Sequence, residues 1–302
     1  MTIPGWVDLQ VNGQIGVDFS SAMLTADDFM RAAEAVLNSG TAVFLPTVIT
    51  SSMELYRRNL PLIAETIENH GLTGQIPGIH LEGPFLNQAP GYSGCHNPEW
   101  MLPPENGMFD ELFDLCRGRL KLITVAASAR KLIPYIKSRG VTVSVGHCPA
   151  EPEELAHAAE AGAELFTHLG NGVPNQLPRH KNVIFNALAE DRLKAMIITD
   201  GFHLPPEVIK CFIRCKGADN IIVISDGSPA AGLPPGRYNV LGNDAILEPE
   251  GKLHNPVKQC LVGSAFTMKR CMDYLRDLEL LTEDELITVG YRNPLAVIGI
   301  KK

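Results

Sequence analysis

Short runs rich in Val, Ile and Leu recur along the chain at regular intervals, with helical segments between them. Short apolar runs of this kind are typical of parallel strands that are buried on both faces. The predicted strands span residues 6–11, 42–47, 76–81, 120–126, 141–145, 165–167, 195–199 and 221–225. Strand–helix alternation repeated eight times predicts an α/β fold, a closed (β/α)8 TIM-like barrel, with a doubly wound open sheet as the alternative.

The predicted helices span residues 26–39, 53–69, 131–139, 151–161, 205–215, 264–278 and 283–291. A barrel of this kind needs about 250 residues, so residues 1–302 are expected to form a single barrel domain. Two long segments, 83–106 and 227–263, leave the C-terminal ends of the third and eighth strands, and the second contains a predicted hairpin at 238–247. Barrel enzymes carry their active sites at that face.

The composition excludes several classes of protein. A net charge of −8 argues against a surface for nucleic acid or for an anionic membrane. The chain contains no uninterrupted run of 18 apolar residues and no basic, then apolar, leader at its start. Its seven cysteines are an odd number without a Cys-x-x-Cys pair, which indicates free thiols in a reducing compartment. A cytoplasmic protein is therefore expected.

Four predicted strands end in side chains that suit one shared site: Glu82, His147, His168 and Asp226. The C-terminal ends of barrel strands meet at a single mouth. One carboxylate and two imidazoles, with a position left open for water, are a common hydrolytic arrangement around a divalent metal. Glu82, His147 and His168 are therefore predicted to bind such an ion.

Asp226 follows a strongly apolar strand, where burial of an unused carboxylate is costly. We interpret it as a general base that takes a proton from water and passes it to a leaving group. A turn or helix-capping aspartate before Gly227 is the alternative. His80 lies two residues before Glu82 and points to the same side of the strand. It either orients Glu82 or fills the barrel interior, and the sequence leaves both readings open.

A family resemblance rests on motifs that occur in order along nearly the whole chain. Residues 80–87 read His-Leu-Glu-Gly-Pro-Phe-Leu-Asn, and residues 94–98 read Gly-Cys-His-Asn-Pro. This pattern resembles the signature loop of the N-acetylglucosamine-6-phosphate deacetylases, which belong to the amidohydrolase superfamily. Further segments that resemble the family lie before and after this loop, at residues 4–13, 45–50, 145–147, 167–171, 200–203, 225–227 and 261–268.

The resemblance implies roles for individual residues. Glu82, His147 and His168 match the metal ligands, Asp226 matches the catalytic acid/base, and His96 matches a histidine that polarises the acetamide carbonyl. The matching substrate-binding positions are Cys95, Asn171, Gly172, Arg179, His203, Leu261, Val262 and Gly263. In the family the arginine, a natural fork for phosphate, can reach in from a neighbouring subunit. A solvated loop cation remains the alternative for Arg179.

Three departures from the family pattern stand out. Many amidohydrolases begin with His-x-His, which binds a second metal, whereas this chain reads Gln10-Val11-Asn12. One divalent ion, with zinc as the expected metal, is therefore predicted. The small β-sandwich usual in the family is expected to be lacking, which leaves a homodimer open. The insert at residues 250–259 is longer than expected, so the sequence leaves open whether the sugar specificity is that of the family.

The sequence thus predicts a metal-dependent hydrolase that converts N-acetylglucosamine-6-phosphate, or a related amino-sugar 6-phosphate, to the free amine and acetate. The small-molecule sugar phosphate is its expected partner. Two rival hypotheses are an amidohydrolase acting on another N-acyl or cyclic amide substrate, and a non-catalytic paralogue that binds sugar phosphates. The complete set of Glu82, His147, His168 and Asp226 argues against the second rival, because a binding protein needs no such set.

Overall fold

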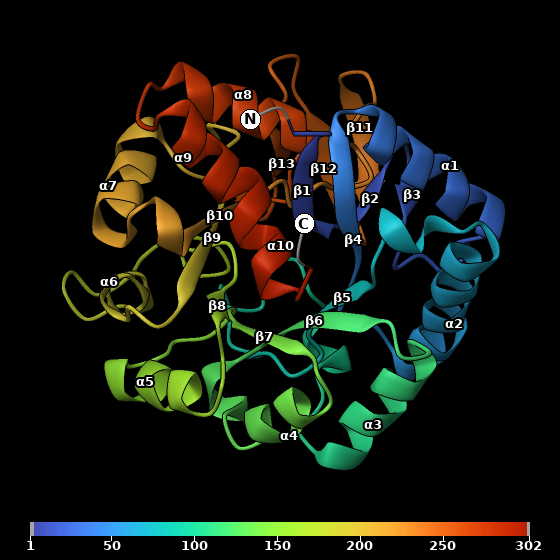
Figure 1. The fold of residues 1–302 in the computed structure, drawn as a ribbon, viewed down its shortest axis with the longest axis horizontal. Helices are drawn as coiled ribbons and strands as arrows, with labels where there is room; N and C mark the ends of the chain where they lie inside the picture. The colour runs from blue at the N-terminus through green and yellow to red at the C-terminus, as the bar shows by residue number, and fades with distance from the viewer. Residues whose placement is uncertain (1–2, 301–302) are drawn as a thin grey trace.

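The computed structural model describes residues 3–300, which form the predicted (β/α)8 barrel (Figure 1). The central sheet has parallel strands in the order β1-β4-β5-β6-β7-β8-β9-β10. Their bounds are β1 Trp6–Val11, β4 Thr41–Ile49, β5 Ile79–Glu82, β6 Leu120–Val125, β7 Thr142–Val145, β8 Leu165–Phe166, β9 Lys194–Ile198 and β10 Ile221–Ile224. The sheet closes where the end of β1 meets the segment after β10, because the Asn12 N–H donates to the Gly227 carbonyl at 2.7 Å.

Helices form a ring around this sheet (Figure 1). Their bounds are α1 Ala26–Asn38, α2 Met53–Asn69, α3 Asn106–Leu115, α4 Ile133–Ser138, α5 Pro152–Glu160, α6 Val183–Ala189, α7 Pro206–Lys216 and α8 Met268–Asp277. Helices α3 and α6 were not among the predicted ones. The first begins just after two prolines, within residues that favour a loop, and the second is only 7 residues long.

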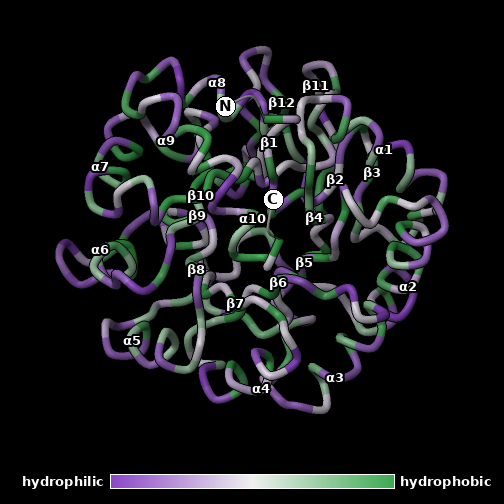
Figure 2. Tube along the Cα trace, in the orientation of Figure 1, coloured by the Kyte–Doolittle hydropathy of each residue, from purple (hydrophilic) through white to green (hydrophobic). Residues whose placement is uncertain are grey.

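Two apolar layers hold the barrel together, one inside the sheet and one between the sheet and the helices. Figure 2 accordingly shows hydrophobic colour along the central strands and mixed colour on the surrounding helices. Helix α10 (Asn293–Val297) lies across the centre of the barrel in Figure 1. It covers the end at which the strands begin, since the Thr142 hydroxyl donates to the Val297 carbonyl and the Asn293 amide donates to the Ile221 carbonyl. The opposite end remains available for a site.

The C-terminal tail differs in detail from the helix predicted at 283–291. Helix α9 spans Glu283–Ile287, a π-helical turn spans Thr288–Arg292, and α10 follows directly. Cys211 and Cys215, whose helical spacing suggests small core residues, are instead exposed on α7. Helical spacing alone does not identify which face of the helix is buried.

A small antiparallel sheet follows β10 and extends the predicted hairpin to four strands. These are β11 Gly236–Val240, β12 Asn243–Leu247, β13 Leu253–Asn255 and β14 Cys260–Leu261. The sheet packs on Ile49, at the end of β4, and on Ala230 through its own apolar cluster. Strands β2 (Gly13–Gln14) and β3 (Val17–Asp18) form a further short pair. Within residues 3–300 the chain contains no β-sandwich.

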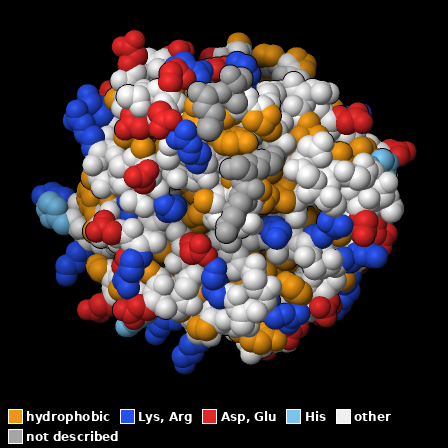
Figure 3. Space-filling model, viewed as in Figure 1, with side chains coloured by type: hydrophobic (Ala, Val, Ile, Leu, Met, Phe, Trp, Pro, Cys, Tyr) orange, Lys and Arg blue, Asp and Glu red, His pale blue; other side chains and the backbone are white. Residues whose placement is uncertain are grey.

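The surface drawn in Figure 3, on the same side as Figure 1, has acidic and basic side chains interspersed. Among the helices of residues 3–300, none combines the length and the hydropathy that crossing a bilayer requires.

Candidate active site

The backbone at three of the four predicted strand ends is unusual. His147, His168 and Asp226 have φ angles of +51°, +27° and +49°. Side chains with a Cβ rarely adopt such values, and each instance costs about 1–3 kcal/mol that the surrounding fold must offset. Strain of this kind concentrates at functional sites, so its occurrence after β7, β8 and β10, at the same end of the barrel, supports a shared chemical purpose.

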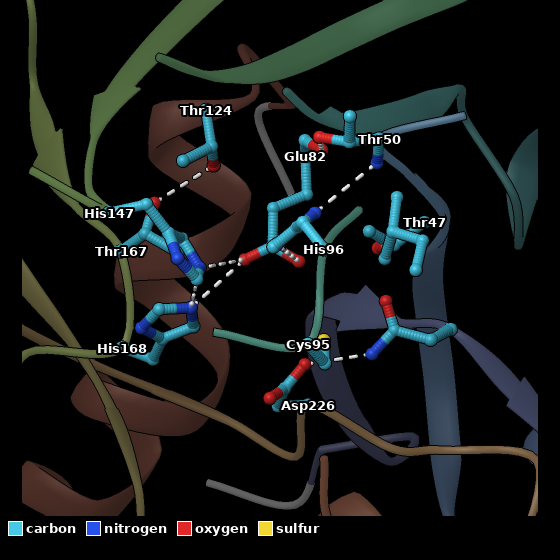
Figure 4. Close-up of polar contacts among 12 residues, drawn as sticks. Thr47, Thr50, Glu82, Cys95, His96, Thr124, His147, Thr167, His168 and Asp226 are labelled. Atoms are coloured by element: carbon cyan, nitrogen blue, oxygen red, sulfur yellow. Dashed lines mark hydrogen bonds and ion pairs between the residues drawn. The ribbon is translucent and has the colours of Figure 1, made fainter. Parts of the chain in front are cut away.

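Glu82, His147 and His168 converge as predicted (Figure 4). The Glu82 Oε1 lies 3.2 Å from His147 Nε2 and 2.9 Å from His168 Nε2, and the two nitrogens are 3.0 Å apart. The ligands of a tetrahedral ion with bonds of about 2.0–2.1 Å stand about 3.3 Å from one another. The three atoms therefore have nearly the spacing that a shared small cation imposes.

The tautomer of His147 also suits a metal ligand. Its Nδ1 lies 2.7 Å from the Tyr92 carbonyl oxygen, so Nδ1 carries the proton and Nε2 presents a lone pair. That lone pair faces both Glu82 Oε1 and His168 Nε2. Without an ion, one N–H on His168 Nε2 would have to serve the Glu82 oxygen and the His147 lone pair at the same time. A cation between them satisfies all three atoms, which is why this donor set fits a divalent metal.

Electrostatics favour the anionic form of Glu82. Burial alone would raise its pKa, but the interactions with the His147, His168 and His96 rings hold the pKa well below its ordinary value. For His168, burial would lower the pKa, whereas the interaction with Glu82 raises it. A carboxylate kept charged in a buried pocket is ready to balance a positive ion.

Gly172 lies where a side chain does not fit. It has φ +62°, and a Cβ there would come within 2.9 Å of the His147 ring and 3.1 Å of the His168 ring. Glycine at this position therefore lets the loop approach both imidazoles closely.

His96 faces the same group from the long loop after β5 (Figure 4). Burial lowers its pKa to about 3, so the ring is neutral. The Thr50 N–H donates to its Nδ1 at 3.3 Å, which puts the proton on Nε2. This Nε2 lies 3.6 Å from Glu82 Oε2, and it has no hydrogen-bond partner within residues 3–300. The geometry leaves a buried N–H donor for a ligand.

Asp226 lies across from Glu82, His147 and His168, and side chains hold its carboxylate (Figure 4). Gln10 Nε2 and Asn12 Nδ2 donate to its Oδ1 at 3.0 and 2.8 Å. Burial and the nearby charge of Glu82 raise its pKa to about 6. These contacts come from another strand rather than from its own turn, so they support a general base more than a turn aspartate.

No hydrogen bond joins His80 to Glu82. Its Nδ1 lies 3.0 Å from the Leu9 carbonyl, and its Nε2 lies 2.9 Å from the Thr124 hydroxyl. Thr124 in turn contacts Thr167 at 2.8 Å. The ring belongs to a polar layer inside the barrel below the site, so of the two readings the structure favours filling of the interior.

A cavity of about 990 Å³ opens over these groups. Most of the predicted substrate-binding residues line it: Cys95, Asn171, Gly172, His203, Leu261 and Gly263. Val262 is buried behind this wall, and Arg179 is exposed and does not line the cavity. Burial raises the pKa of the Cys95 thiol, which agrees with a pocket lining rather than a nucleophile.

Some functional neighbours escaped the sequence predictions. Asp200 accepts a hydrogen bond from His203 Nδ1 at 2.7 Å and another from the Ser264 hydroxyl, so it fixes the imidazole that faces the cavity. Although burial opposes it, the interaction with His203 lowers the pKa of Asp200 to about 2. The small sheet adds Lys252 and Lys258 to the cavity wall. Asp200 lies in a recognised motif, but only the fold reveals which side chain it holds.

Buried polar atoms that find no hydrogen-bond partner in the described part of the chain, residues 3–300, gather at this site. They are Gln10 Oε1, Asn12 Oδ1, His96 Nε2, His168 Nδ1 and Asn171 Nδ2. Native proteins leave few such atoms unsatisfied, and those that remain usually face a ligand, an ion or water. Their collection around one cavity supports a binding function there.

Comparisons with known proteins agree with this site. No protein-family model matches the chain. The chain is 31% identical to N-acetylglucosamine-6-phosphate deacetylase of Danio rerio over 98% of its length and 75% of the relative. It is 27% identical to N-acetylgalactosamine-6-phosphate deacetylase of Escherichia coli, over 98% of this chain and 78% of the relative.

Solved structures show the same similarity. The N-acetyl-D-glucosamine-6-phosphate deacetylase of Mycobacterium smegmatis matches with a TM-score of 0.88 at 27% identity, over 99% of this chain and 78% of that one. A mutant of that enzyme in complex with N-acetyl-D-glucosamine-6-phosphate matches with a TM-score of 0.89. Because the barrel, the site and the similarity to these relatives agree, we conclude that the chain belongs to the N-acetylglucosamine-6-phosphate deacetylase family.

Proposed function

We propose that this protein hydrolyses the acetamide of an N-acetyl amino-sugar 6-phosphate, with N-acetylglucosamine-6-phosphate as the first candidate, to the amino-sugar phosphate and acetate. The observation that carries the proposal is the convergence of Glu82, His147 and His168 on one point, opposite the buried carboxylate of Asp226. Membership of the family supplies the substrate class.

A divalent ion held by Glu82, His147 and His168 would supply Lewis-acid polarisation of the amide carbonyl and of water. Asp226 then accepts a proton from the attacking water and delivers it to the departing amine nitrogen. Its raised pKa suits both transfers near neutral pH. His96 donates its free Nε2–H to the carbonyl oxygen as negative charge develops there.

A net charge of −8 does not preclude recognition of an anion, because Lys252 and Lys258 line the cavity. His203, oriented by Asp200, presents its other ring nitrogen to the phosphate. Arg179 is proposed to contact the phosphate from a neighbouring subunit, since in its own chain it is exposed outside the cavity. The neutral sugar would lie against Cys95, Asn171, Gly172 and the backbone at 261–263.

Four finer points belong to the same proposal. Zinc is the proposed ion, because one carboxylate and two imidazoles suit its tetrahedral preference. A homodimer is proposed because it would bring Arg179 to a partner cavity. A single metal-dependent hydrolase domain over residues 1–302 is proposed on the continuous barrel. A cytoplasmic location is proposed because all seven cysteines are unpaired, as is usual in a reducing compartment.

An acetate-release assay tests the proposal. Purified protein, stripped of metal and reloaded with zinc, is given N-acetylglucosamine-6-phosphate, the galactosamine epimer, and the same sugars without phosphate. We expect release from the phosphorylated sugars and much weaker release from the others. Equal release with and without phosphate would indicate another N-acyl substrate, and binding without release would indicate a non-catalytic protein.

A further inference from the structure

Strand β1 contains an irregularity just before the site. Asp8 pairs with Phe44 and Val11 pairs with Pro46, so three steps on β1 oppose two steps on β4. One extra residue on one strand is a β-bulge. A bulge changes which side chains face each side of a sheet, and bulges occur frequently beside active sites.

The bulge redirects two amide side chains. Before it, Val7 and Leu9 pack in the apolar interior of the barrel. Regular alternation would then turn Gln10 and Asn12 outward. Instead Val11 packs in the outer apolar layer, while Gln10 and Asn12 reach Asp226 at the barrel mouth.

Both amides bond the same oxygen of Asp226. Gln10 Nε2 lies 3.0 Å and Asn12 Nδ2 lies 2.8 Å from Oδ1, and both residues are buried. Their own carbonyl oxygens, Gln10 Oε1 and Asn12 Oδ1, have no partner among residues 3–300. Rotating either amide would set its oxygen against the carboxylate, so the charge of Asp226 fixes their orientation.

The same strand also holds the residues on either side of Asp226. The Asp8 carboxylate accepts from the Ser225 N–H at 3.1 Å and from the Ser225 hydroxyl at 2.5 Å. The Asn12 N–H donates to the Gly227 carbonyl at 2.7 Å. Through these contacts β1 fixes three consecutive residues, in the middle of which Asp226 adopts its left-handed φ of +49°.

We propose that the β1 bulge makes Gln10 and Asn12 positioning residues for proton transfer by Asp226. Two N–H donors on Oδ1 set the rotamer of the carboxylate and leave Oδ2 as the oxygen that exchanges protons in the cavity. Neither amide acts on the substrate itself. The inference rests on the proposed function, because it assigns to Gln10 and Asn12 a part in the step that Asp226 performs there.

The test compares Gln10→Ala, Asn12→Ala and the double variant with the wild-type protein, each loaded with zinc. If positioning is their role, kcat for acetate release falls by about tenfold to a hundredfold for each single variant, as expected for loss of a hydrogen bond to a charged group. KM stays within about twofold and zinc content is unchanged, because substrate and metal contacts remain. A crystal structure of Asn12→Ala should show the Asp226 carboxylate rotated away from its original position.

Asn59→Ala is the matched control. Asn59 is also a buried amide that donates two hydrogen bonds, to the carbonyls of Phe19 and Ser21, but it lies on α2 and does not line the cavity. Its loss should lower Tm without lowering kcat. If the alanine variants do not fold, Gln10→Met nearly keeps the side-chain volume while removing the N–H donors, and the same fall in kcat is expected.

The outcomes separate the two proposals. If wild-type protein releases no acetate from any sugar, the proposed function fails. The positioning role is tested separately, since an unmoved Asp226 carboxylate in the Asn12→Ala crystal structure would by itself overturn it. Active wild-type protein with folded variants of unchanged kcat would overturn positioning and leave the function intact. A raised KM at unchanged kcat, or a loss of zinc, would likewise overturn it, since the amides would then contact substrate or metal.

Discussion

Asp226→Asn should weaken catalysis and strengthen the fold at the same time. Asparagine has nearly the same shape, tolerates a left-handed φ and keeps an oxygen that accepts from Gln10 and Asn12. It has no basic oxygen for proton transfer. Removing a general base costs about 10²–10⁴ in turnover, so kcat for acetate release should fall by that factor while bound zinc is retained.

The gain in stability follows from the raised pKa of Asp226. In the metal-free fold the pKa rises from 3.8 to about 6, mainly through burial. Because the folded-state pKa is the higher one, the contribution of Asp226 to stability is fully present below pH 3.8. This contribution is lost as the pH rises through about 6. At 1.36 kcal/mol for each pKa unit, the ionised Asp226 lowers the free energy of unfolding by roughly 3 kcal/mol at pH 8 and by about half of that at pH 5.

The assay is denaturant or thermal unfolding of metal-free wild-type protein and variant at pH 5 and pH 8. Asp226→Asn should be the more stable protein at both values, by a margin that is larger at pH 8. A variant that is less stable at pH 8, or one with near-full activity, would refute the assignment of a buried, strained base at this position.

Three further predictions test other parts of the site. His203→Ala should raise KM for the phosphorylated sugar by about tenfold to a hundredfold and leave the unphosphorylated sugar unaffected; equal losses on both would remove its phosphate role. Gly172→Ala should weaken zinc binding, measured by competition with a chelator, because the new Cβ meets the rings of His147 and His168; unchanged affinity would show that the loop yields. Burial raises the pKa of Asp8 to about 7, so wild-type stability should fall between pH 4 and 7, and Asp8→Asn should flatten that slope in unfolding curves; an equally steep slope would exclude Asp8 as its source.

The sequence was sufficient to predict the barrel, because strand runs and their C-terminal polar residues follow local rules. The convergence of Glu82, His147 and His168 followed from the same geometry. The helix α3 was missed, since tertiary packing overrode a loop-like start. The hairpin was found, but not the two additional strands that complete its sheet.

The surroundings of Asp226 were beyond sequence reasoning for a different physical reason. The pair Gln10 and Asn12 was noticed only as a departure from His-x-His. Its contact with Asp226 depends on a one-residue bulge and on pairing between the first and last strands of the barrel. Neither leaves a local signal, and a register that is one residue different would turn both amides away. The resemblance supplied Arg179, whose place depends on an assembly that a single chain does not contain.

The central claim is that Glu82, His147 and His168 hold one catalytic ion. X-ray absorption at the zinc edge, on protein loaded with one equivalent of zinc, measures this most directly. The account predicts one tightly bound zinc per chain with only nitrogen and oxygen neighbours, two of the neighbours being imidazoles, and loss of that signal in Glu82→Gln. Zinc bound through sulfur, or a spectrum unchanged by Glu82→Gln, would contradict it.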